Sequence, residues 1–535
     1  MNHRLSITFL LLFSCYCSGL PNVRPSNILV FLPTPVKSHF GSFKPLLEAL
    51  VTRGHNLTLV SPFALSPTAD DGSPLLYTHV RVNHNKKVSG PNFLDRNSFT
   101  NWLPMYMLTL WLGPHITRGA LENEVVKDFV LNDAGQYDLV VVENFFHEGF
   151  VSLGYKYGVP VVQLLSFAAN ARVSQWHGNP YDPSYIADFC VGYTAPMTFL
   201  QRVDNALAAV FNTWINRLVY VPQQQALVRE YFRFAGHERM PDLETMLRNV
   251  SLTLINSHPM IGPAVPLVPS FVQVAGMHLK PAQTLPQDLK TILDTSEHGV
   301  VYFSLGSVIQ SSKMPKETVS LLLSELAKIQ QIVLWKWEDD QLPNLPKNVV
   351  VRKWFPQNDI LAHPNCRLFI THGGIHSVIE AIYHGVPMLS IPVFGDQKHN
   401  SVEAESRGFA LYVSYFDLTA ELFGTKLQKL LHDPRFGEAV SKASSILRDD
   451  PIPVLEKAVF WVEYVIRHKG APHLRTAAND LYWFQYYLLD VIAAISLLLA
   501  FVLYLNYKFF SYLLRKTCTA KSSPAKVTKR KHKKQ

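Results

Sequence analysis

The chain has few cysteines and few charged residues for its length of 535 residues. Of its five cysteines, Cys15 and Cys17 lie in an apolar leader and Cys518 lies in a basic tail. The other two, Cys190 and Cys366, are too few for a disulfide framework or a cysteine-based metal site, and whether they bridge stays open. Charged residues make up 17% and hydrophobic residues 48%, so we expect a globular body with two or more domains.

Acidic residues are absent from Asn506–Gln535, which holds ten lysines and arginines. Without these ten, the net charge of +9 becomes about −1, so the body has no general basic surface. Nucleic acid is therefore not predicted as a partner. The charge instead predicts a cytosolic tail over 508–535, close to lipid headgroups. The end of the tail, Lys531–Gln535, resembles a dilysine retrieval signal of endoplasmic reticulum membrane proteins, with an ordinary stop-transfer cluster as the alternative.

Two apolar segments predict membrane targeting. Residues 1–19 combine Arg4, an apolar run and the small residues Ser18 and Gly19, which is typical of a signal peptide. Residues 486–507 are apolar almost throughout, with aromatic residues before them and lysines beyond, which predicts one transmembrane helix. We therefore expect a single-pass type I protein of the endoplasmic reticulum membrane with its body in the lumen. Of two glycosylation sequons, the one at Asn249 is favoured over the one at Asn56, which starts an expected buried strand.

Two α/β patterns follow one another. The first opens with an apolar strand at Asn27–Leu32, a loop at Thr34–Phe43, a helix at Lys44–Arg53 and a strand at Asn56–Val60, which predicts a parallel sheet. Six prolines between His258 and Lys290 then indicate an interdomain linker. We expect an N-terminal domain at 20–260, a linker at 261–290, a second domain at 291–450, and C-terminal helices with a juxtamembrane segment at 451–485.

The segment Asn101–Gly113 is rich in large apolar side chains. We slightly favour a core helix here. The alternatives are a wall for an apolar ligand and a patch that enters the membrane.

Polar residues between Trp354 and Gln397 fall at the turns of two strand–turn–helix units. A strand at Leu368–Ile370 is broken by His372–Gly374, Ser377 is expected to cap a helix that ends at Gly385, and Val386–Val393 is a second strand ahead of Asp396. Ligands bind at the carboxyl ends of strands in an open α/β sheet, and a helix start with nearby glycines suits phosphate. Trp354 offers a face for a flat base, and several polar side chains offer hydrogen bonds to hydroxyls: Glu380, Asp396 and Gln397. These features predict a nucleotide-sugar site.

This segment resembles the signature of the UDP-glycosyltransferase family, and in particular its membrane-bound animal members from insects. The matching positions are Trp354, Pro356, Gln357, His363, His372, Gly374, Ser377, Glu380, Gly385, Pro387, Asp396 and Gln397. The resemblance covers nearly the whole chain and is weakest at about 65–130 and 170–250. It implies an α/β fold of two Rossmann-like domains facing across a cleft (GT-B), with the nucleotide sugar held by the C-terminal domain. It also implies inverting transfer of a hexose from a UDP-sugar to a small lipophilic acceptor, such as a xenobiotic, a pigment or a hormone.

By this resemblance His39, after the first strand, matches the catalytic base. A base of this kind needs a carboxylate to orient its ring. The aspartate of vertebrate relatives is replaced here by Glu143, and insect relatives have a second acid at the position of Glu148. Either could pair with His39, and Glu143 is favoured because it ends a strand.

The resemblance also implies the donor contacts. Trp354 stacks on uracil, Gln357 and Glu380 bind the ribose, and Asp396 and Gln397 hold the sugar, with Asn400 nearby. The diphosphate is held by the backbone near Gly374 and by three side chains: Ser307, His372 and Ser377. His376 stands where many relatives have asparagine, which leaves its role toward phosphate open. The chain has no D-x-D pair of carboxylates, so neither a metal ion nor any cofactor besides the UDP-sugar co-substrate is expected.

The donor sugar is less clearly indicated. Asp396 and Gln397 occur in both glucose and glucuronate users, and the insect-like features favour UDP-glucose. UDP-glucuronate is the first alternative. A non-catalytic, membrane-tethered ligand binder is the second. The oligomeric state, a homo-oligomer included, is left open.

Overall fold

A computed structural model describes residues 24–66, 68, 72–83, 94 and 102–520, with side chains to residue 517. The predicted signal peptide, most of the basic tail and Cys15, Cys17 and Cys518 lie outside the residues or side chains described. The described chain divides into two units, residues 1–476 and 477–535.

The first unit contains two parallel sheets. The N-terminal sheet has the order β3-β2-β1-β4-β5-β6-β7, and every neighbouring pair is parallel. Its strands are β1 (Asn27–Phe31), β2 (Asn56–Ser61), β3 (Thr78–Arg81), β4 (Leu139–Glu143), β5 (Val161–Leu165), β6 (Leu252–Ile255) and β7 (Phe271–Gln273). Valine, leucine and isoleucine dominate these strands because both faces of the sheet are covered by helices.

The second sheet has the order β10-β9-β8-β11-β12-β13 and is also parallel throughout. Its strands are β8 (Val300–Ser304), β9 (Ile332–Lys336), β10 (Val349–Arg352), β11 (Cys366–Thr371), β12 (Met388–Ser390) and β13 (Ala410–Tyr412). The expected pair of α/β domains is thus present, and the strands expected at Asn27–Leu32, Asn56–Val60 and Leu368–Ile370 correspond to β1, β2 and β11.

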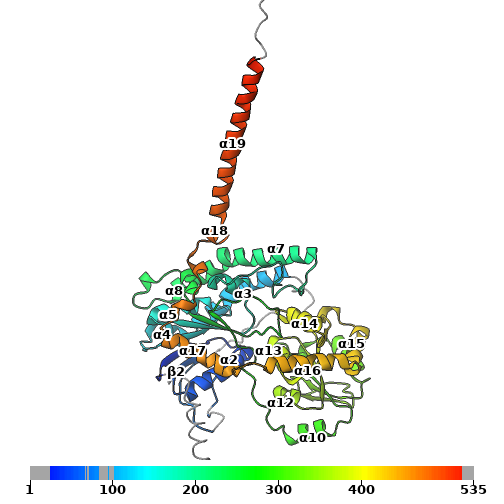
Figure 1. Cartoon of the computed structure of the whole chain (residues 1–535). Helices are drawn as coiled ribbons and strands as arrows, with labels where there is room; N and C mark the ends of the chain where they lie inside the picture. Colours follow the sequence, from blue (N-terminus) through cyan, green and yellow to red (C-terminus); the bar gives the residue numbers. More distant parts are fainter. Residues whose placement is uncertain (1–23, 67, 69–71, 84–93, 95–101, 521–535) are drawn as a thin grey trace, which may run out of the picture. The chain divides into compact units, whose positions relative to one another are not determined.

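Helices surround both sheets (Figure 1). In the N-terminal domain they are α2 (Lys37–Thr52), α3 (Trp102–Leu121), α4 (Glu124–Asn132), α5 (Ser152–Tyr157), α6 (Ala171–His177), α7 (Phe199–Ile215), α8 (Val221–Tyr231) and α9 (Leu243–Arg248). In the second domain they are α10 (Gln287–Thr295), α11 (Lys316–Leu326), α12 (Gln357–Leu361), α13 (Ile375–His384), α14 (Gln397–Ser406), α15 (Ala420–His432) and α16 (Pro434–Arg448).

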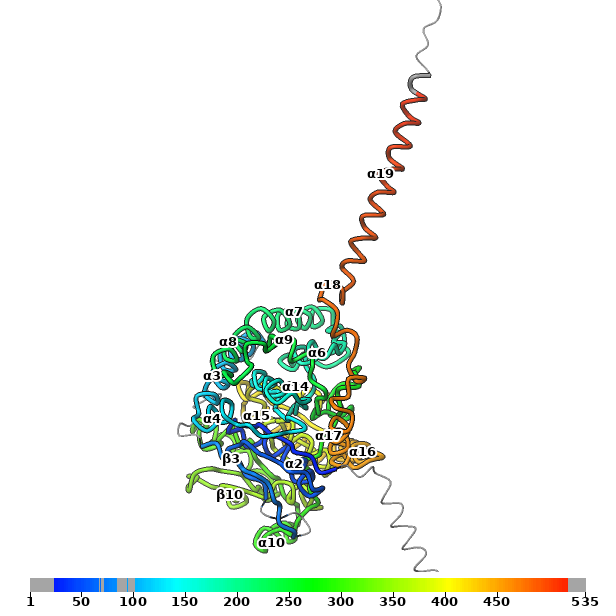
Figure 2. Tube along the Cα trace, turned by 90° about the vertical axis from the view of Figure 1, so that its left-hand side faces the viewer, coloured from blue at the N-terminus to red at the C-terminus, as the bar shows by residue number. Residues whose placement is uncertain are grey.

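The chain returns to the N-terminal domain after α16. Helix α17 (Val454–Arg467) packs against α2, as both views show (Figures 1 and 2). Its apolar stripe joins the core that α2 forms with the first sheet, through Ala458, Val459, Val462 and Val465. Arg53 adds an ion pair of 3.2 Å to Glu463. The second domain is therefore connected to the first at both of its ends.

Two local expectations are wrong. Residues 37–43 are not a loop but the first two turns of α2, because Phe40 and Phe43 are buried in the core despite the nearby serines, glycine and Pro45 that suggest a loop. Ser377 does not cap α13, because that helix begins at Ile375 with Gly374 at its N-cap and no side-chain cap. Gly385 ends α13 in the left-handed conformation (φ 71°), as expected. The strand expected at Val386–Val393 is limited to β12.

Helix α3 is only in part a core helix. Its residues Tyr106 and Gly113 are buried, whereas Leu103, Met107 and Trp111 are exposed. Along this helix, the apolar residues in the sequence therefore do not predict which side chains are buried.

The second unit holds α18 (Trp483–Tyr486) and α19 (Leu489–Ala520). An 18-residue window within Leu489–Thr517 of α19 has a mean hydropathy of 2.2, and this segment is long and apolar enough to cross a membrane. The helix starts three residues later than the segment expected at 486–507 and continues well beyond it.

Candidate active site

A cavity of about 640 Å³ lies between the two domains. It is lined by His39 of the N-terminal domain and by every residue predicted to bind the donor: Ser307, Trp354, Gln357, His372, Gly374, His376, Ser377, Glu380, Asp396 and Gln397. Parallel strands fix this position. In each sheet the chain reverses its direction of winding between two neighbouring strands, β1 and β4 in the first and β8 and β11 in the second. His39 follows β1, Ser307 follows β8 and His372 follows β11, so all three lie where such sheets bind ligands.

The imidazole of His39 is oriented by Glu143. Its Nδ1 lies 2.5 Å from Oε1 of Glu143, the last residue of β4. The hydroxyl of Ser166 donates to the same oxygen at 3.0 Å, and the ring of Phe145 lies edge-on to the imidazole with centroids 4.4 Å apart. A carboxylate only accepts hydrogen bonds, so Nδ1 of His39 carries the hydrogen and Nε2 is left with a free lone pair. This arrangement suits a general base.

Glu148 faces a different part of the domain. It is fully buried, accepts from the hydroxyl of Tyr220 at 2.6 Å and lies 3.6 Å from the guanidinium of Arg172. Of the two candidate carboxylates, the structure brings Glu143 to His39 and places Glu148 in this separate cluster.

The N-terminus of α13 points into the donor half of the cavity. Gly373 has φ 78°, and a Cβ there would lie 2.3 Å from Oγ of Ser401. A Cβ at Gly374 would meet the ring of His372 at 2.4 Å. Both positions therefore require glycine, and the first backbone N–H groups of α13 stay open to a ligand. Such a helix start attracts phosphate through its N–H groups and its dipole.

The histidines around this helix start are neutral at physiological pH. Burial, together with the charge of Lys336, lowers the pKa of His372 to about 4. Burial also lowers the pKa of His376, with added effects from neighbouring histidines. A diphosphate bound here would be stabilised by backbone N–H groups and neutral imidazole donors rather than by imidazolium charge.

Gln357 and Glu380 form one hydrogen-bonded group. Nε2 of Gln357 donates to Oε2 of Glu380 at 2.5 Å and to Oγ of Ser377 at 3.3 Å. Burial raises the pKa of Glu380 to about 7, against the lowering effect of the hydrogen bond from Gln357. The Trp354 side chain is 61% exposed, with the ammonium group of Lys37 at 4.8 Å from its ring centroid.

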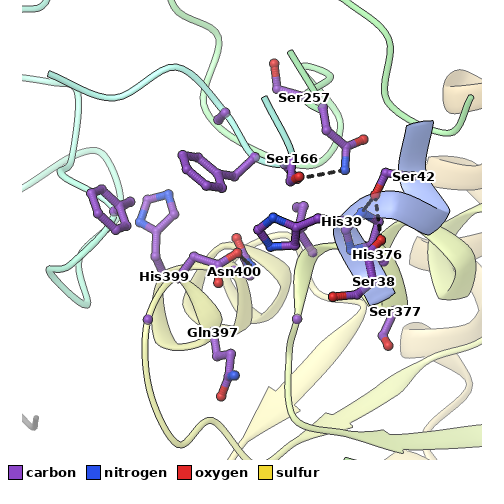
Figure 3. Close-up of a pocket in the computed structure, with 18 of the residues that line it drawn as sticks. Ser38, His39, Ser42, Ser166, Ser257, His376, Ser377, Gln397, His399 and Asn400 are labelled. Carbon is purple, nitrogen blue, oxygen red and sulfur yellow. Dashed lines mark hydrogen bonds between the residues drawn. The ribbon is translucent and has the colours of Figure 1, made fainter. Parts of the chain in front are cut away.

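The start of α14 supplies the remaining polar groups, close to His39 (Figure 3). Nδ2 of Asn400 donates to Oδ2 of Asp396 at 2.8 Å and to the carbonyl of Gly373 at 3.1 Å, which ties α14 to the turn before α13. Oε1 of Gln397 accepts from the backbone N–H groups of Val393 and Phe394, so its amide nitrogen remains available to a ligand. Burial raises the pKa of Asp396.

The N-terminal half of the cavity is predominantly apolar. Its walls are Met105, Leu108 and Leu112 of α3 together with Phe145, Phe146, Phe167 and Phe189. Polar side chains such as Ser166, Asn170 and Asn256 interrupt this wall, and the buried guanidinium of Arg172 lies over the rings of Phe146 and Tyr220. This half suits a flat or apolar molecule whose hydroxyl lies near His39.

Comparison with known proteins identifies the family. The family model described as UDP-glucoronosyl and UDP-glucosyl transferase matches residues 27–523. The chain belongs to this UDP-glycosyltransferase family. Among its relatives, UDP-glycosyltransferase UGT5 of Dactylopius coccus is 35% identical over 513 residues, which cover 94% of this chain and 96% of the relative. UDP-glucuronosyltransferase 2B7 of Homo sapiens is 33% identical over 484 residues, covering 88% and 90%.

Solved glycosyltransferases share the fold at low sequence identity. Glycosyltransferase VinC in complex with DTDP superposes with a TM-score of 0.55 and 18% identity, covering 83% of this chain and all of that one. UDP-glucose:anthocyanidin 3-O-glucosyltransferase in complex with UDP gives a TM-score of 0.55 and 16% identity, covering 83% and 99%. The predicted GT-B fold is thereby confirmed, as are the family and the enzyme class. The comparisons give no support to a non-catalytic binder.

Several side chains in the cavity of this UDP-glycosyltransferase escape sequence reasoning. Lys336 ends β9, donates to the carbonyl of Gly306 at 3.0 Å and pairs with Glu338 at 2.7 Å. The carboxyl-end rule for strands could have found it. Ser42 of α2 hydrogen-bonds Nε2 of His376 across the cavity (Figure 3), and no local pattern links residues so far apart in the sequence.

His278, in the proline-rich linker, also lines the cavity and is not predicted from the sequence. Its ring nitrogens are buried without a hydrogen-bond partner among the described residues, and Nε2 lies 3.8 Å from Glu380. The pKa of His278 is lowered to about 4 by burial.

Among the described residues of this transferase, no group of three or more His, Cys, Asp or Glu side chains is placed to hold a metal ion. Cys190 and Cys366 are both free thiols.

Proposed function

We propose that this enzyme transfers a hexose from a UDP-sugar, with UDP-glucose preferred to UDP-glucuronate, to a hydroxyl of a small lipophilic acceptor, with inversion at the sugar carbon. The observation that carries the proposal is that His39, whose ring is held by Glu143, lines one cavity with the whole set of donor residues. His39 is the base, and Glu143 positions it.

The reaction is a single displacement. The acceptor oxygen forms a bond to C1 of the sugar while its proton passes to Nε2 of His39. The bond from C1 to the diphosphate breaks, and its electron pair leaves with UDP. Glu143 stabilises the imidazolium that forms, and the N-terminus of α13 stabilises the departing charge. Attack from the side opposite to the leaving group inverts the configuration.

The donor would lie along the C-terminal side of the cavity. Trp354 stacks on uracil, Gln357 and Glu380 accept and donate hydrogen bonds at the ribose, and Asp396 and Gln397 bind sugar hydroxyls. Ser307, His372, His376 and Ser377 lie around the α13 N-terminus and complete the diphosphate site.

The charges in the cavity favour glucose over glucuronate. A glucuronate carboxylate needs a free cation, and three described lysines or arginines line the cavity: Lys37, Arg172 and Lys336. Lys336 is paired with Glu338, Arg172 lies beside Glu148, and the ammonium group of Lys37 lies over the ring of Trp354. UDP-glucuronate remains the alternative donor.

We further propose that α19 anchors the enzyme in the endoplasmic reticulum membrane, with the domains in the lumen and the basic tail in the cytosol. The length and hydropathy of α19 support the span, and the sequence of the two chain ends supports the orientation and the compartment.

The direct test uses microsomes that contain the full chain, incubated with radiolabelled UDP-glucose or UDP-glucuronate and a panel of phenols and other hydroxylated acceptors. We expect labelled product with UDP-glucose and none in microsomes with the His39→Ala variant, which should still bind UDP. Product from UDP-glucuronate alone would overturn the sugar assignment. Unchanged turnover in His39→Ala would overturn the base.

A further inference from the structure

Arg172 is a buried arginine in the wall of the acceptor half of the cavity, and its hydrogen-bond donors are unused within the described chain. Its side chain is only 9% exposed, and it lines the cavity. Asn170 caps α6 by accepting from the N–H of Val173 at 3.1 Å, which fixes the start of the helix that carries Arg172. A guanidinium has five N–H donors, yet this one makes no hydrogen bond to another described residue. A buried donor without a partner is costly, so a bound molecule that offers an oxygen here gains affinity.

The positive charge of Arg172, in contrast, is already balanced. Its Nη2 lies 3.6 Å from Oε1 of Glu148, which makes an ion pair but is too long for a hydrogen bond. Glu148 is fully buried, and its Oε2 accepts from Tyr220, whereas its Oε1 has no hydrogen-bond partner among the described residues. The pair of Arg172 and Glu148 therefore offers directional N–H donors to the cavity without a net charge.

This combination favours a neutral oxygen over an anionic one. A carboxylate bound to Arg172 would bring a second negative charge beside Glu148 in an apolar pocket, and two carboxylates that share one site repel each other. A carbonyl oxygen has two lone pairs and no charge, so it accepts from the guanidinium without this repulsion. A molecule with no oxygen at this point would leave the donors unpaired.

The aromatic wall separates this oxygen from the reacting hydroxyl. The imidazole of His39 lies 4.4 Å from the ring of Phe145, whereas Cζ of Arg172 lies 5.7 Å from the centroid of Phe146. The two phenylalanine rings are neighbours, with centroids 4.3 Å apart. The base and the guanidinium thus contact different rings of one aromatic pair. An acceptor that meets both has its hydroxyl and its carbonyl at opposite ends.

Phe146 is a fixed part of this wall. Its φ of 61° lies in the left-handed region, which a bulky residue rarely adopts. Its carbonyl accepts from the hydroxyl of Thr117 and from Nε2 of Gln224, the latter at 3.4 Å. A backbone conformation of this cost persists only where the surrounding structure enforces it. The spacing between the base and the guanidinium is therefore set by the fold.

We propose that Arg172 selects the acceptor by donating to a neutral carbonyl oxygen, that of a ketone, a quinone or a lactone. The acceptor class is then a flat conjugated molecule with its reacting hydroxyl at one end, near His39, and the carbonyl at the other. The proposal rests on the transfer reaction proposed above and narrows its lipophilic acceptor to one class. Arg172 touches the substrate away from the reacting atoms, so it determines specificity.

The test compares three flat two-ring acceptors in microsomes that contain the full chain and the UDP-sugar that supports transfer. Umbelliferone has its hydroxyl and its lactone carbonyl at opposite ends, β-naphthol has no carbonyl, and a naphthol with a carboxylate on its other ring supplies the anionic alternative. The variant is Arg172→Met, which keeps the length of the side chain and removes the donors. Arg172→Met combined with Glu148→Gln removes both buried charges, so it retains the test if the single variant does not fold.

Arg118→Met is the matched control. Arg118 is an arginine of the same domain that pairs with Glu230 at 3.1 Å, but its side chain is 44% exposed and does not line the cavity. The measured quantity is the ratio of kcat/KM for umbelliferone to kcat/KM for β-naphthol. We expect this ratio to fall about ten- to hundredfold in both Arg172 variants, the effect of one hydrogen bond to a charged group, and to stay at the parent value in Arg118→Met.

An equal loss for umbelliferone and β-naphthol would show a structural role for Arg172 and would overturn the proposal. A parent enzyme that prefers the carboxylate-bearing naphthol, and loses that preference in Arg172→Met, would replace the carbonyl site with an anion site. If the parent transfers sugar to none of the three, the proposed reaction fails for this class, and binding of umbelliferone is then measured by its own fluorescence. Weaker binding to Arg172→Met than to Arg118→Met would still support the carbonyl contact, and equal binding would refute it.

Discussion

Replacing Glu143 with glutamine is the sharpest single test of the catalytic geometry. The carboxylate of Glu143 accepts from Nδ1 of His39 at 2.5 Å and so holds the lone pair of the ring on Nε2, toward the cavity. A glutamine of the same shape still accepts the hydrogen bond from Ser166 but presents an amide that can donate. If that amide donates to Nδ1, the hydrogen moves to Nε2 and His39 can no longer accept a proton from the substrate.

The expected loss of rate follows from the two effects that Glu143 has on His39. Glu143 fixes the tautomer and stabilises the imidazolium in the transition state, and general base catalysis accounts for roughly 10²–10⁴ in rate. We therefore expect kcat to fall by about that factor, or about 3–5 kcal/mol in activation free energy. Donor KM should change little, because Glu143 does not line the cavity.

The assay is steady-state transfer with saturating acceptor and varied UDP-sugar, alongside UDP binding by calorimetry. Glu148→Gln is the matched control, because it removes a buried carboxylate from the same domain that contacts Tyr220 and Arg172 instead of His39. It should lower the unfolding free energy while leaving kcat of the folded fraction near that of the parent. A larger loss of kcat in Glu148→Gln than in Glu143→Gln would refute the assignment of the pair.

Three further predictions concern the donor half. Trp354→Ala should weaken UDP binding by about 1–3 kcal/mol through lost stacking, without affecting the fold of an exposed position, and an unchanged Kd in calorimetry would contradict the stacking role. Burial raises the pKa of the Glu380 carboxyl from its ordinary value of 4.5 to about 7 in the folded enzyme. Proton binding by Glu380 therefore stabilises the folded state in full below about pH 4.5, and this stabilisation is lost as the pH rises through about 7. Glu380→Gln should therefore be more stable than the parent at about pH 8, by up to about 3 kcal/mol in denaturant unfolding. The same variant should bind UDP more weakly. Equal stability of the two proteins at that pH would show that burial does not destabilise the ionised carboxylate. Ser42→Ala removes the partner of Nε2 of His376 and should lower the unfolding free energy by about 1–3 kcal/mol, and no change would mean that the contact across the cavity contributes nothing.

The sequence predicts the sheets well because buried parallel strands are continuous apolar runs that carry their own signal. The strands around Leu368–Ile370 and Leu139–Val142 are examples, and the carboxyl-end rule then places His372 and Glu143 at the site. The prediction of a loop around His39 is wrong. The local composition there favours turns, but a helix forms because it buries Phe40 and Phe43 against the sheet.

Other features depend on contacts that no local pattern records. Glu143 ends β4 and Glu148 follows five residues later, and the sequence offers both as partners of His39. The strand end brings Glu143 to His39, whereas the path of the chain after β4 brings Glu148 to Tyr220. In α7 the face that the helix buries is decided by the hydrogen bonds of Asn205 and Asn212.

Helix α17 determines how the second domain is connected to the first. Because α17 packs with α2 in the first core, the second domain is an insertion held by two connections, near residues 274–286 and 449–453. A body held at two points can open and close about the line that joins them but cannot swivel freely. Donor entry and release would then follow one hinge motion. Because α2 carries His39 in its first turn, that hinge would keep the base on the fixed side while the donor moves toward it.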